Sequence, residues 1–230
     1  EGKSAIVTGS TSGIGLAYAR ALAAEGADVV INGFGPADAI ETERKKIETD
    51  FGVKALYSPA DMTKPDEIAA MVKLAADSFG GPDILINNNG GPPPRDFRQV
   101  DAAALQAGIA ANMATPIALV QRVIDGMTSR GWGRIVCITS ASVKSPVAGL
   151  DLSSGARLGL TGFLGGVARQ VAKDGVTINF LLPGLFATRR LAGVTAFAAK
   201  SAGIDALEAE ERSRARIPVA RIGDPAEFGA

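Results

Sequence analysis

The stretch TGSTSGIG, from Thr8 to Gly15, has residues suited to binding the phosphates of a dinucleotide. Gly9 allows a tight turn, Gly13 lets the backbone approach a pyrophosphate, and Gly15 permits close packing of the following helix. The N-terminus of that helix offers free N–H groups and a partial positive charge to phosphates. The pattern predicts a dinucleotide site, and a purely structural turn is the alternative.

Ser153 and Arg157 lie four residues apart in a helical pattern, so their side chains share one helix face. Arg157 can donate several hydrogen bonds and carries a positive charge, although a surface arginine is the alternative. Lys144 follows the apolar run from Gly133 to Ser140, at the carboxyl end of a predicted strand. Ligands bind near such strand ends in open α/β sheets, so Lys144 is a candidate proton donor. An exposed loop lysine is the alternative there.

Composition excludes several classes of function. The chain has no histidine, which removes a Ser-His-Asp triad, a histidine base and a His-ligated zinc, and we expect no metal. Lys plus Arg number 24, as do Asp plus Glu, so we expect neither a nucleic-acid nor a membrane partner. The single cysteine, Cys137, lies in the apolar run RIVCIT and is expected to be buried in a strand. A cytoplasmic protein fits this usage.

The N-terminal residues EGKSAIVTG lead directly into a strand, so we expect no signal peptide. We also expect no membrane span, because no continuous apolar run reaches the ~18 residues that one needs.

Short apolar runs alternate with longer amphipathic ones along the whole chain. Strands are predicted at residues 4–9, 27–33, 53–61, 82–90, 133–140 and 176–184, and helices at 13–26, 37–52, 64–80, 100–130, 153–175, 188–216 and from 224. The alternation predicts an α/β protein with a Rossmann-type, doubly wound parallel sheet and helices on both faces. We expect a single domain over residues 1–230, from which a C-terminal strand is missing.

Several motifs, in chain order, resemble those of the short-chain dehydrogenase/reductase family. The glycine spacing of the turn matches TGxxxGIG, and NNNG at Asn87–Gly90 is similar to the family's NNAG. Asn112 falls where its active-site helix asparagine would lie, and Ser140 ends the fifth strand like its catalytic serine. PGLFAT, at Pro183–Thr188, looks like its nicotinamide-side loop. The resemblance covers essentially the whole chain, and VVINGFG is locally similar to the family's bacterial 3-hydroxybutyrate dehydrogenases.

The resemblance implies that a hydride moves between a nicotinamide and a carbonyl or alcohol carbon. Family members use a tyrosine thirteen residues after the serine and a lysine four residues later, but here those positions hold Ser153 and Arg157. The chain's two tyrosines, Tyr18 and Tyr57, lie elsewhere and are read as packing residues. We therefore expect an atypical active site formed by Asn112, Ser140, Ser153 and Arg157, with Lys144 as a candidate. We expect Ser140 and a water to sustain turnover. That turnover should be slow, because losing a general acid lowers the rate by about 10²–10⁴-fold.

The implied cofactor contacts lie at Gly9, Ser12, Gly13, Ile14, Gly15, Phe34, Asp61, Met62, Asn88, Asn89, Gly90, Arg157, Pro183, Gly184 and Thr188. NAD(H) is favoured over NADP(H), which stays possible, because no Lys or Arg lies between Val29 and Glu43 to meet a 2′-phosphate. Asp61 could accept a hydrogen bond from the adenine amino group or cap the next helix.

The function predicted from the sequence is NAD(P)-dependent interconversion of a carbonyl and an alcohol on a small-molecule substrate. The alternative is a non-catalytic dinucleotide-binding protein of the same fold that acts by binding or assembly. The resemblance also implies a homotetramer or homodimer, assembled through the long fourth and fifth helices. The proline-rich loop Gly90–Phe97 could border the substrate.

Overall fold

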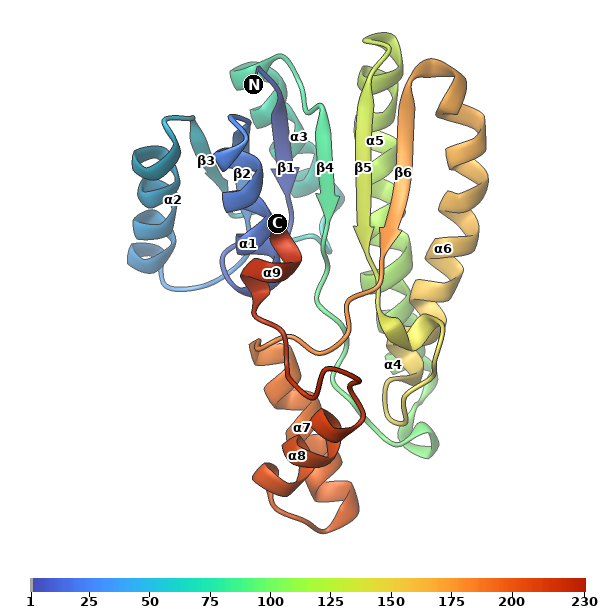
Figure 1. The fold of residues 1–230 in the computed structure, drawn as a ribbon. Helices are drawn as coiled ribbons and strands as arrows, with labels where there is room; N and C mark the ends of the chain where they lie inside the picture. The colour runs from blue at the N-terminus through green and yellow to red at the C-terminus, as the bar shows by residue number, and fades with distance from the viewer. Residues whose placement is uncertain (1) are drawn as a thin grey trace.

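A parallel six-stranded sheet forms the centre of the chain, as the computed structural model shows for residues 2–230 (Figure 1). The strands lie in the order β3-β2-β1-β4-β5-β6. Their bounds are β1 Ser4–Val7, β2 Asp28–Asn32, β3 Ala55–Ser58, β4 Ile84–Asn87, β5 Gly133–Ile138 and β6 Val176–Leu181. The predicted doubly wound parallel sheet is confirmed, with each strand somewhat shorter than the apolar run that predicted it.

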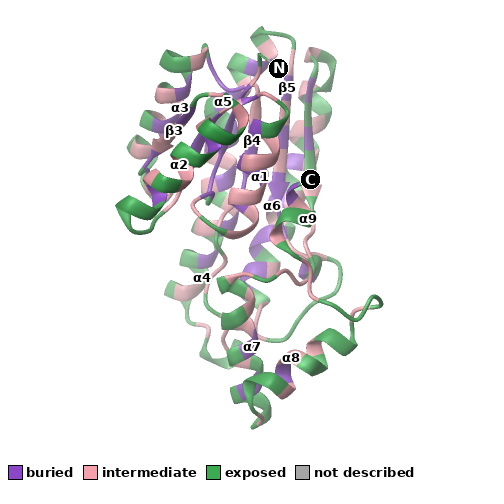
Figure 2. Ribbon diagram, turned by 60° about the vertical axis from the view of Figure 1, so that its left-hand side comes forward, coloured by how far each residue is buried: buried purple, intermediate pink, exposed green. Residues whose placement is uncertain are grey.

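Helices cover both faces of this sheet. The α-helices of the described residues are α1 Gly13–Ala24, α2 Ala37–Phe51, α3 Pro65–Phe79, α4 Ala102–Ile109, α5 Thr115–Ser129, α6 Asp151–Val171, α7 Arg189–Ala202, α8 Ala206–Ala215 and α9 Pro225–Gly229. Side chains alternate between the two faces along each strand. In β1, for example, Ile6 packs with α3, α5 and α6, whereas Ala5 and Val7 pack with α1 and α2. Figure 2 shows this buried centre in purple.

A π-helical turn, Ala110–Ala114, joins α4 to α5 and makes one helix of residues 102–129. By length and composition alone, this joined helix could cross a membrane, with a mean hydropathy of 1.4, so the expectation of no such segment is not confirmed. A core helix passes the same test. The buried side chains of α5, among them Leu119, Val123 and Met127, belong to the cluster that packs on the sheet.

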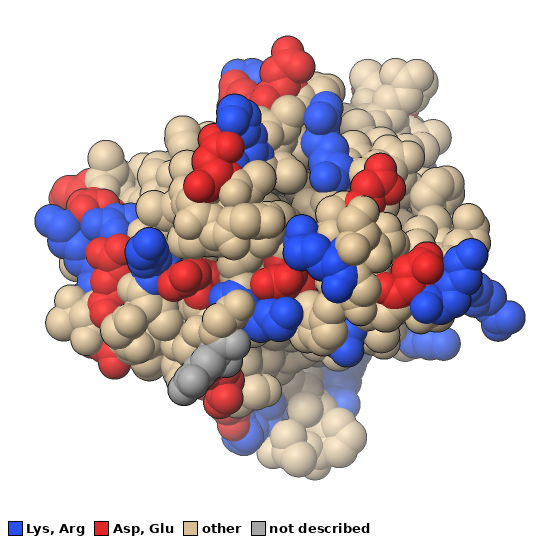
Figure 3. Space-filling view, turned by 90° about the horizontal axis from the view of Figure 1, so that it is seen from above, with Lys and Arg blue, Asp and Glu red and all other residues tan. Residues whose placement is uncertain are grey.

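Helices α7 and α8 extend beyond the carboxyl edge of the sheet, and α9 returns to α1 (Figure 1). Phe228 of α9 packs edge-on against Tyr18 of α1, with ring centroids 5.7 Å apart, so Tyr18 is a packing residue as predicted. Seen from above, acidic and basic side chains are interspersed over the surface (Figure 3), as the equal numbers of the two signs suggest.

Candidate active site

The strand order places a crevice at the carboxyl edge of the sheet, between β1 and β4. Chain connections run in opposite directions from these two neighbouring strands, which is where open α/β sheets bind ligands. The glycine-rich turn follows β1, the NNNG segment follows β4, and Ser140 follows β5. These three predicted segments therefore meet at one edge of the sheet.

The glycine-rich turn fits a dinucleotide. Gly9 and Gly13 both have a φ of 58°, in the left-handed region that favours glycine. A Cβ on Gly9 would lie 2.7 Å from the backbone oxygen of Asn88, so a side chain would disrupt the turn. Ser12 is the N-cap of α1 but makes no capping hydrogen bond with its side chain. The first N–H groups of α1 are thus left for phosphates.

Asn88 holds this turn from the neighbouring strand. Its side-chain amide donates to the backbone oxygens of Thr8 and Gly9, both at 3.2 Å, and its backbone N–H donates to the Thr8 hydroxyl at 2.8 Å. Across the crevice, Thr188 at the end of the Pro183–Thr188 loop has Cγ2 3.3 Å from where a Cβ on Gly13 would lie. The two segments assigned to cofactor binding therefore face each other.

Arg157 is buried, with only 7 % of its surface exposed, so the surface alternative is wrong. Its guanidinium spans the ends of two strands: Nη1 donates to Ile138 O at 2.6 Å, and Nη2 donates to Asn89 O at 2.7 Å. Nε donates to Ser153 Oγ at 3.1 Å, as the shared helix face predicts. The arginine thus links α6 to the ends of β4 and β5.

Asn112 completes this buried cluster. Its side-chain amide donates to Gly90 O at 2.7 Å, and its Oδ1 accepts from the Ser153 hydroxyl at 3.3 Å. Asn112 lies in the π-helical turn of the joined helix. Such π-turns often occur at functional sites. Nearby, Asn89 Oδ1 is buried without a hydrogen-bond partner among the described residues. An orphaned acceptor beside Arg157 fits a ligand that brings hydroxyl groups to this crevice.

The cluster is positively charged. Burial, and to a smaller extent the positive charge of Arg190, lowers the pKa of Arg157 to about 10. No carboxylate lies within ion-pair distance of Arg157 in the part of the chain that the structure describes. Cys137, in β5 beneath it, is a buried thiol whose pKa burial raises to about 12. Its predicted role as a buried strand residue is confirmed.

Ser140 is the N-cap of a short 3-10 helix, Ala141–Val143. Its Oγ accepts from the Ser142 backbone N–H at 3.2 Å and from the Ser142 hydroxyl at 2.8 Å. Ser142 in turn accepts from the Ser154 hydroxyl at 2.9 Å. Sequence reasoning missed Ser142 and Ser154, for which the serine-rich segments SAS and SS were the only signal. Lys144 ends this 3-10 helix with an exposed side chain, as its surface alternative expected.

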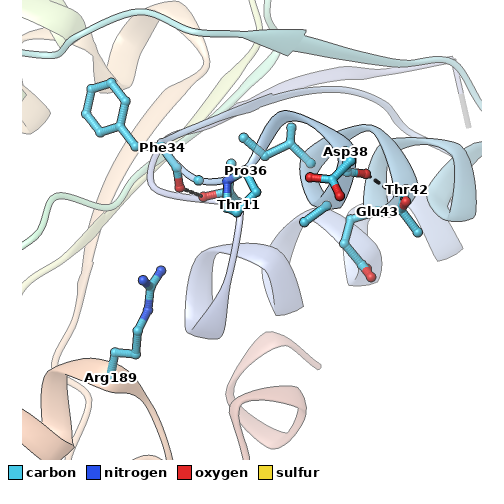
Figure 4. Close-up of a pocket in the computed structure, with 10 residues that line it drawn as sticks. Thr11, Phe34, Pro36, Asp38, Thr42, Glu43 and Arg189 are labelled. Carbon is cyan, nitrogen blue, oxygen red and sulfur yellow. Dashed lines mark hydrogen bonds between the residues drawn. The ribbon is translucent and has the colours of Figure 1, made fainter.

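A pocket of about 290 Å³ lies beyond the carboxyl end of β2 (Figure 4). It is lined by Thr11, Phe34, Asp38, Glu43 and Arg189, among others. Arg189 of α7 also lines this pocket. The cofactor prediction assumed that no basic residue lies near Phe34, and that assumption is wrong because the fold brings Arg189 close. The Phe34 side chain is 65 % exposed and points away from the pocket in Figure 4.

The capping role considered for Asp61 is also wrong. The N-cap of α3 is Lys64, and the Asp61 carboxylate accepts locally from the Thr63 backbone at 2.9 Å and hydroxyl at 2.8 Å. Met62 and Ile14, both assigned to cofactor binding, are partly buried and pack against the two core clusters.

Comparison with known proteins matches this chain to the short chain dehydrogenase family over residues 3–198. It is 42% identical to a D-beta-hydroxybutyrate dehydrogenase of Rhizobium meliloti, over 81% of this chain and 72% of that protein. It is 37% identical to a D-beta-hydroxybutyrate dehydrogenase of Cupriavidus necator, over 100% of this chain and 88% of that protein. The crystal structure of an actinorhodin polyketide ketoreductase variant with NADPH superposes with a TM-score of 0.92 at 30% identity, over 99% of this chain and 87% of that one.

The chain therefore belongs to the short chain dehydrogenase family. It is an NAD(P)-dependent oxidoreductase that interconverts a carbonyl and an alcohol on a small substrate. The non-catalytic alternative has no support in these findings.

Proposed function

We propose that this oxidoreductase works with Ser153 and Arg157 in place of the tyrosine and lysine that its family uses. The observation that carries the proposal is the burial of Arg157 at the ends of β4 and β5, in hydrogen-bond contact with Ser153. Arg157 keeps the positive charge of a lysine, and its remaining N–H donors suit the hydroxyls of a nicotinamide ribose. When bound, the nicotinamide supplies or accepts the hydride.

The substrate oxygen is held by Ser140. Its Oγ already accepts two hydrogen bonds from Ser142, so its own proton is available for the oxygen of a carbonyl substrate. The Ser153 hydroxyl, by contrast, already donates a hydrogen bond to Asn112 Oδ1. The proton that reaches the substrate oxygen therefore comes from a water held by Ser140, Ser153 and Asn112, in the room that a tyrosine ring would fill.

NAD(H) is the proposed cofactor, although the pocket beyond β2 contains charges of both signs. Arg189 lines this pocket, but so do the carboxylates of Asp38 and Glu43. Glu43 already pairs with Lys46 at 2.8 Å, whereas Asp38 makes no ion pair with any described residue. A free carboxylate accepts from a ribose 2′-hydroxyl and repels a 2′-phosphate.

The proposed assembly is a homodimer or homotetramer. An apolar groove of about 390 Å³ between α4 and α6 is lined by Phe97, Leu105, Ile109, Met113 and Leu152, among others. Leu158 and Phe163 on α6 are also exposed. Such an apolar surface supports pairing of copies through these helices. Light scattering on the purified protein measures the mass of the assembly.

The proposed catalytic machinery is tested by NADH oxidation against a panel of small carbonyl compounds, comparing wild type with Ser140→Ala. We expect slow but measurable turnover, and a loss of about 10²-fold or more in the variant, because Ser140 contacts the oxygen on which charge develops. Ser129→Ala, at the exposed end of α5, is the matched control. Equal rates for Ser140→Ala and Ser129→Ala would contradict the assignment.

A further inference from the structure

Arg190, the second residue of α7, is held over the loop that follows β4. Its Nη1 donates to Pro92 O at 2.7 Å and to Gly91 O at 3.3 Å. Its Nη2 and Nε have no hydrogen-bond partner among residues 2–230. Backbone contacts thus fix one edge of the guanidinium, and the other donors are free to bind a ligand.

Those free donors lie beside the buried cluster. The point where a Cβ on Gly91 would lie is 2.9 Å from Arg190 Nη2 and 3.3 Å from Ser153 Oγ. Gly91 therefore leaves no room for a side chain, and Arg190 Nη2 and Ser153 Oγ both lie close to the same point beside it. A substrate whose reacting carbon lies near Ser153 would reach Arg190 with its neighbouring group.

No carboxylate in the described part of the chain balances the charges of Arg190 and Arg157. Arg190 has no carboxylate within ion-pair distance among the described residues, and neither has Arg157. Elsewhere in the chain, arginines at positions 44, 212 and 221 each pair with a nearby glutamate. Two like charges close enough for one to lower the pKa of the other favour an anion between or beside them.

We propose that Arg190 binds the carboxylate of the substrate, so that this enzyme acts on small free hydroxy acids and oxo acids. The planar guanidinium offers a carboxylate parallel hydrogen bonds, which a neutral ester or a thioester cannot match. In the oxidation, the alcohol carbon gives a hydride to NAD⁺ and the hydroxyl proton leaves to water, while the carboxylate is unchanged. The inference rests on the proposed function for its reaction, but binding tests it separately.

Binding is measured by titration calorimetry with NAD⁺ present, using acetoacetate and its methyl ester as probes. Both cofactor and probes are oxidised, so no turnover disturbs the titration. We expect acetoacetate to bind more tightly by about tenfold to a hundredfold, the range for a charged hydrogen-bonded pair. Arg190→Met should remove most of that difference, and Arg190→Lys should keep part of it.

Arg122→Met, on the exposed face of α5, is the matched control and should bind both probes as wild type does. Equal binding of acid and ester, no binding of either, or undiminished acid binding by Arg190→Met would each overturn the proposal. Near-normal NADH affinity of both Arg190 variants verifies that they are folded.

Turnover separates this inference from the proposed function. A wild type that reduces the acid and the ester with equal kcat/KM would overturn the role of Arg190 and leave the reaction standing. Preferential acid binding that Arg190 controls, in a protein without turnover on any carbonyl, would support the anion site and refute the proposed chemistry.

Discussion

Replacing Arg157 with lysine should destabilise the fold although the charge is kept. The arginine fork reaches two strands, donating to Ile138 O at 2.6 Å and to Asn89 O at 2.7 Å through different nitrogens. A lysine has a single nitrogen and cannot reproduce the fork. At least one hydrogen bond from a charged donor is lost, which costs about 1.5–3 kcal/mol, while the burial of the charge is not relieved.

Urea denaturation followed by circular dichroism measures this loss of free energy directly, and a thermal melt followed by the same signal measures Tm. In a chain of this size, each kcal/mol lowers Tm by about 2–4 °C, so Arg157→Lys should melt roughly 3–12 °C below wild type. Arg122→Lys on the exposed face of α5 should change stability by less than about 0.5 kcal/mol. If Arg157→Lys is as stable as Arg122→Lys, the fork does not tie the strand ends together and our reasoning about this arginine fails.

Three further predictions concern the reaction. Lys144→Met should leave the rate within about twofold of wild type, because this lysine is exposed, and loss of most activity would restore it as a proton donor. The double variant Ser153→Tyr with Arg157→Lys should raise the turnover rate by about 10²-fold or more, the range for a positioned general acid, and an unchanged rate would mean that more than the acid is lacking. Calorimetry should show that wild type binds NADH more tightly than NADPH, and tighter NADPH binding would overturn the preference. The ratio of the two dissociation constants should fall in Asp38→Asn and rise by up to about fivefold in Arg189→Ala.

The local parts of the fold could be predicted because their signals lie close together in the sequence. Alternating apolar runs predicted the parallel sheet, and the i, i+4 spacing predicted the contact between Ser153 and Arg157. The π-turn that sets Asn112 was missed, because one extra residue per turn leaves an apolar helical pattern almost unchanged.

Contacts between distant segments could not be predicted from a single sequence. Arg189 and Arg190 come from α7 to reach segments that follow β2 and β4, and no local pattern records such an approach. The burial of Arg157 was also undecided, because a lone arginine in an apolar helix suits either surface or site. The Arg157 guanidinium donates to backbone carbonyls. Every residue has a backbone carbonyl, so the sequence does not reveal these hydrogen-bond partners.

A crystal structure with bound NAD⁺ tests the central claim most directly, namely that Ser153 and Arg157 stand where the family's tyrosine and lysine would. The measured quantity is the distance from the Arg157 guanidinium to the hydroxyls of the nicotinamide ribose. We expect a nitrogen within about 3.2 Å of a ribose oxygen, the range of a hydrogen bond, with a water between Ser140 and Ser153. A nicotinamide ribose bound out of reach of Arg157 would contradict the claim. So would a side chain that fills the space between Ser140 and Ser153 and contacts the nicotinamide without a water.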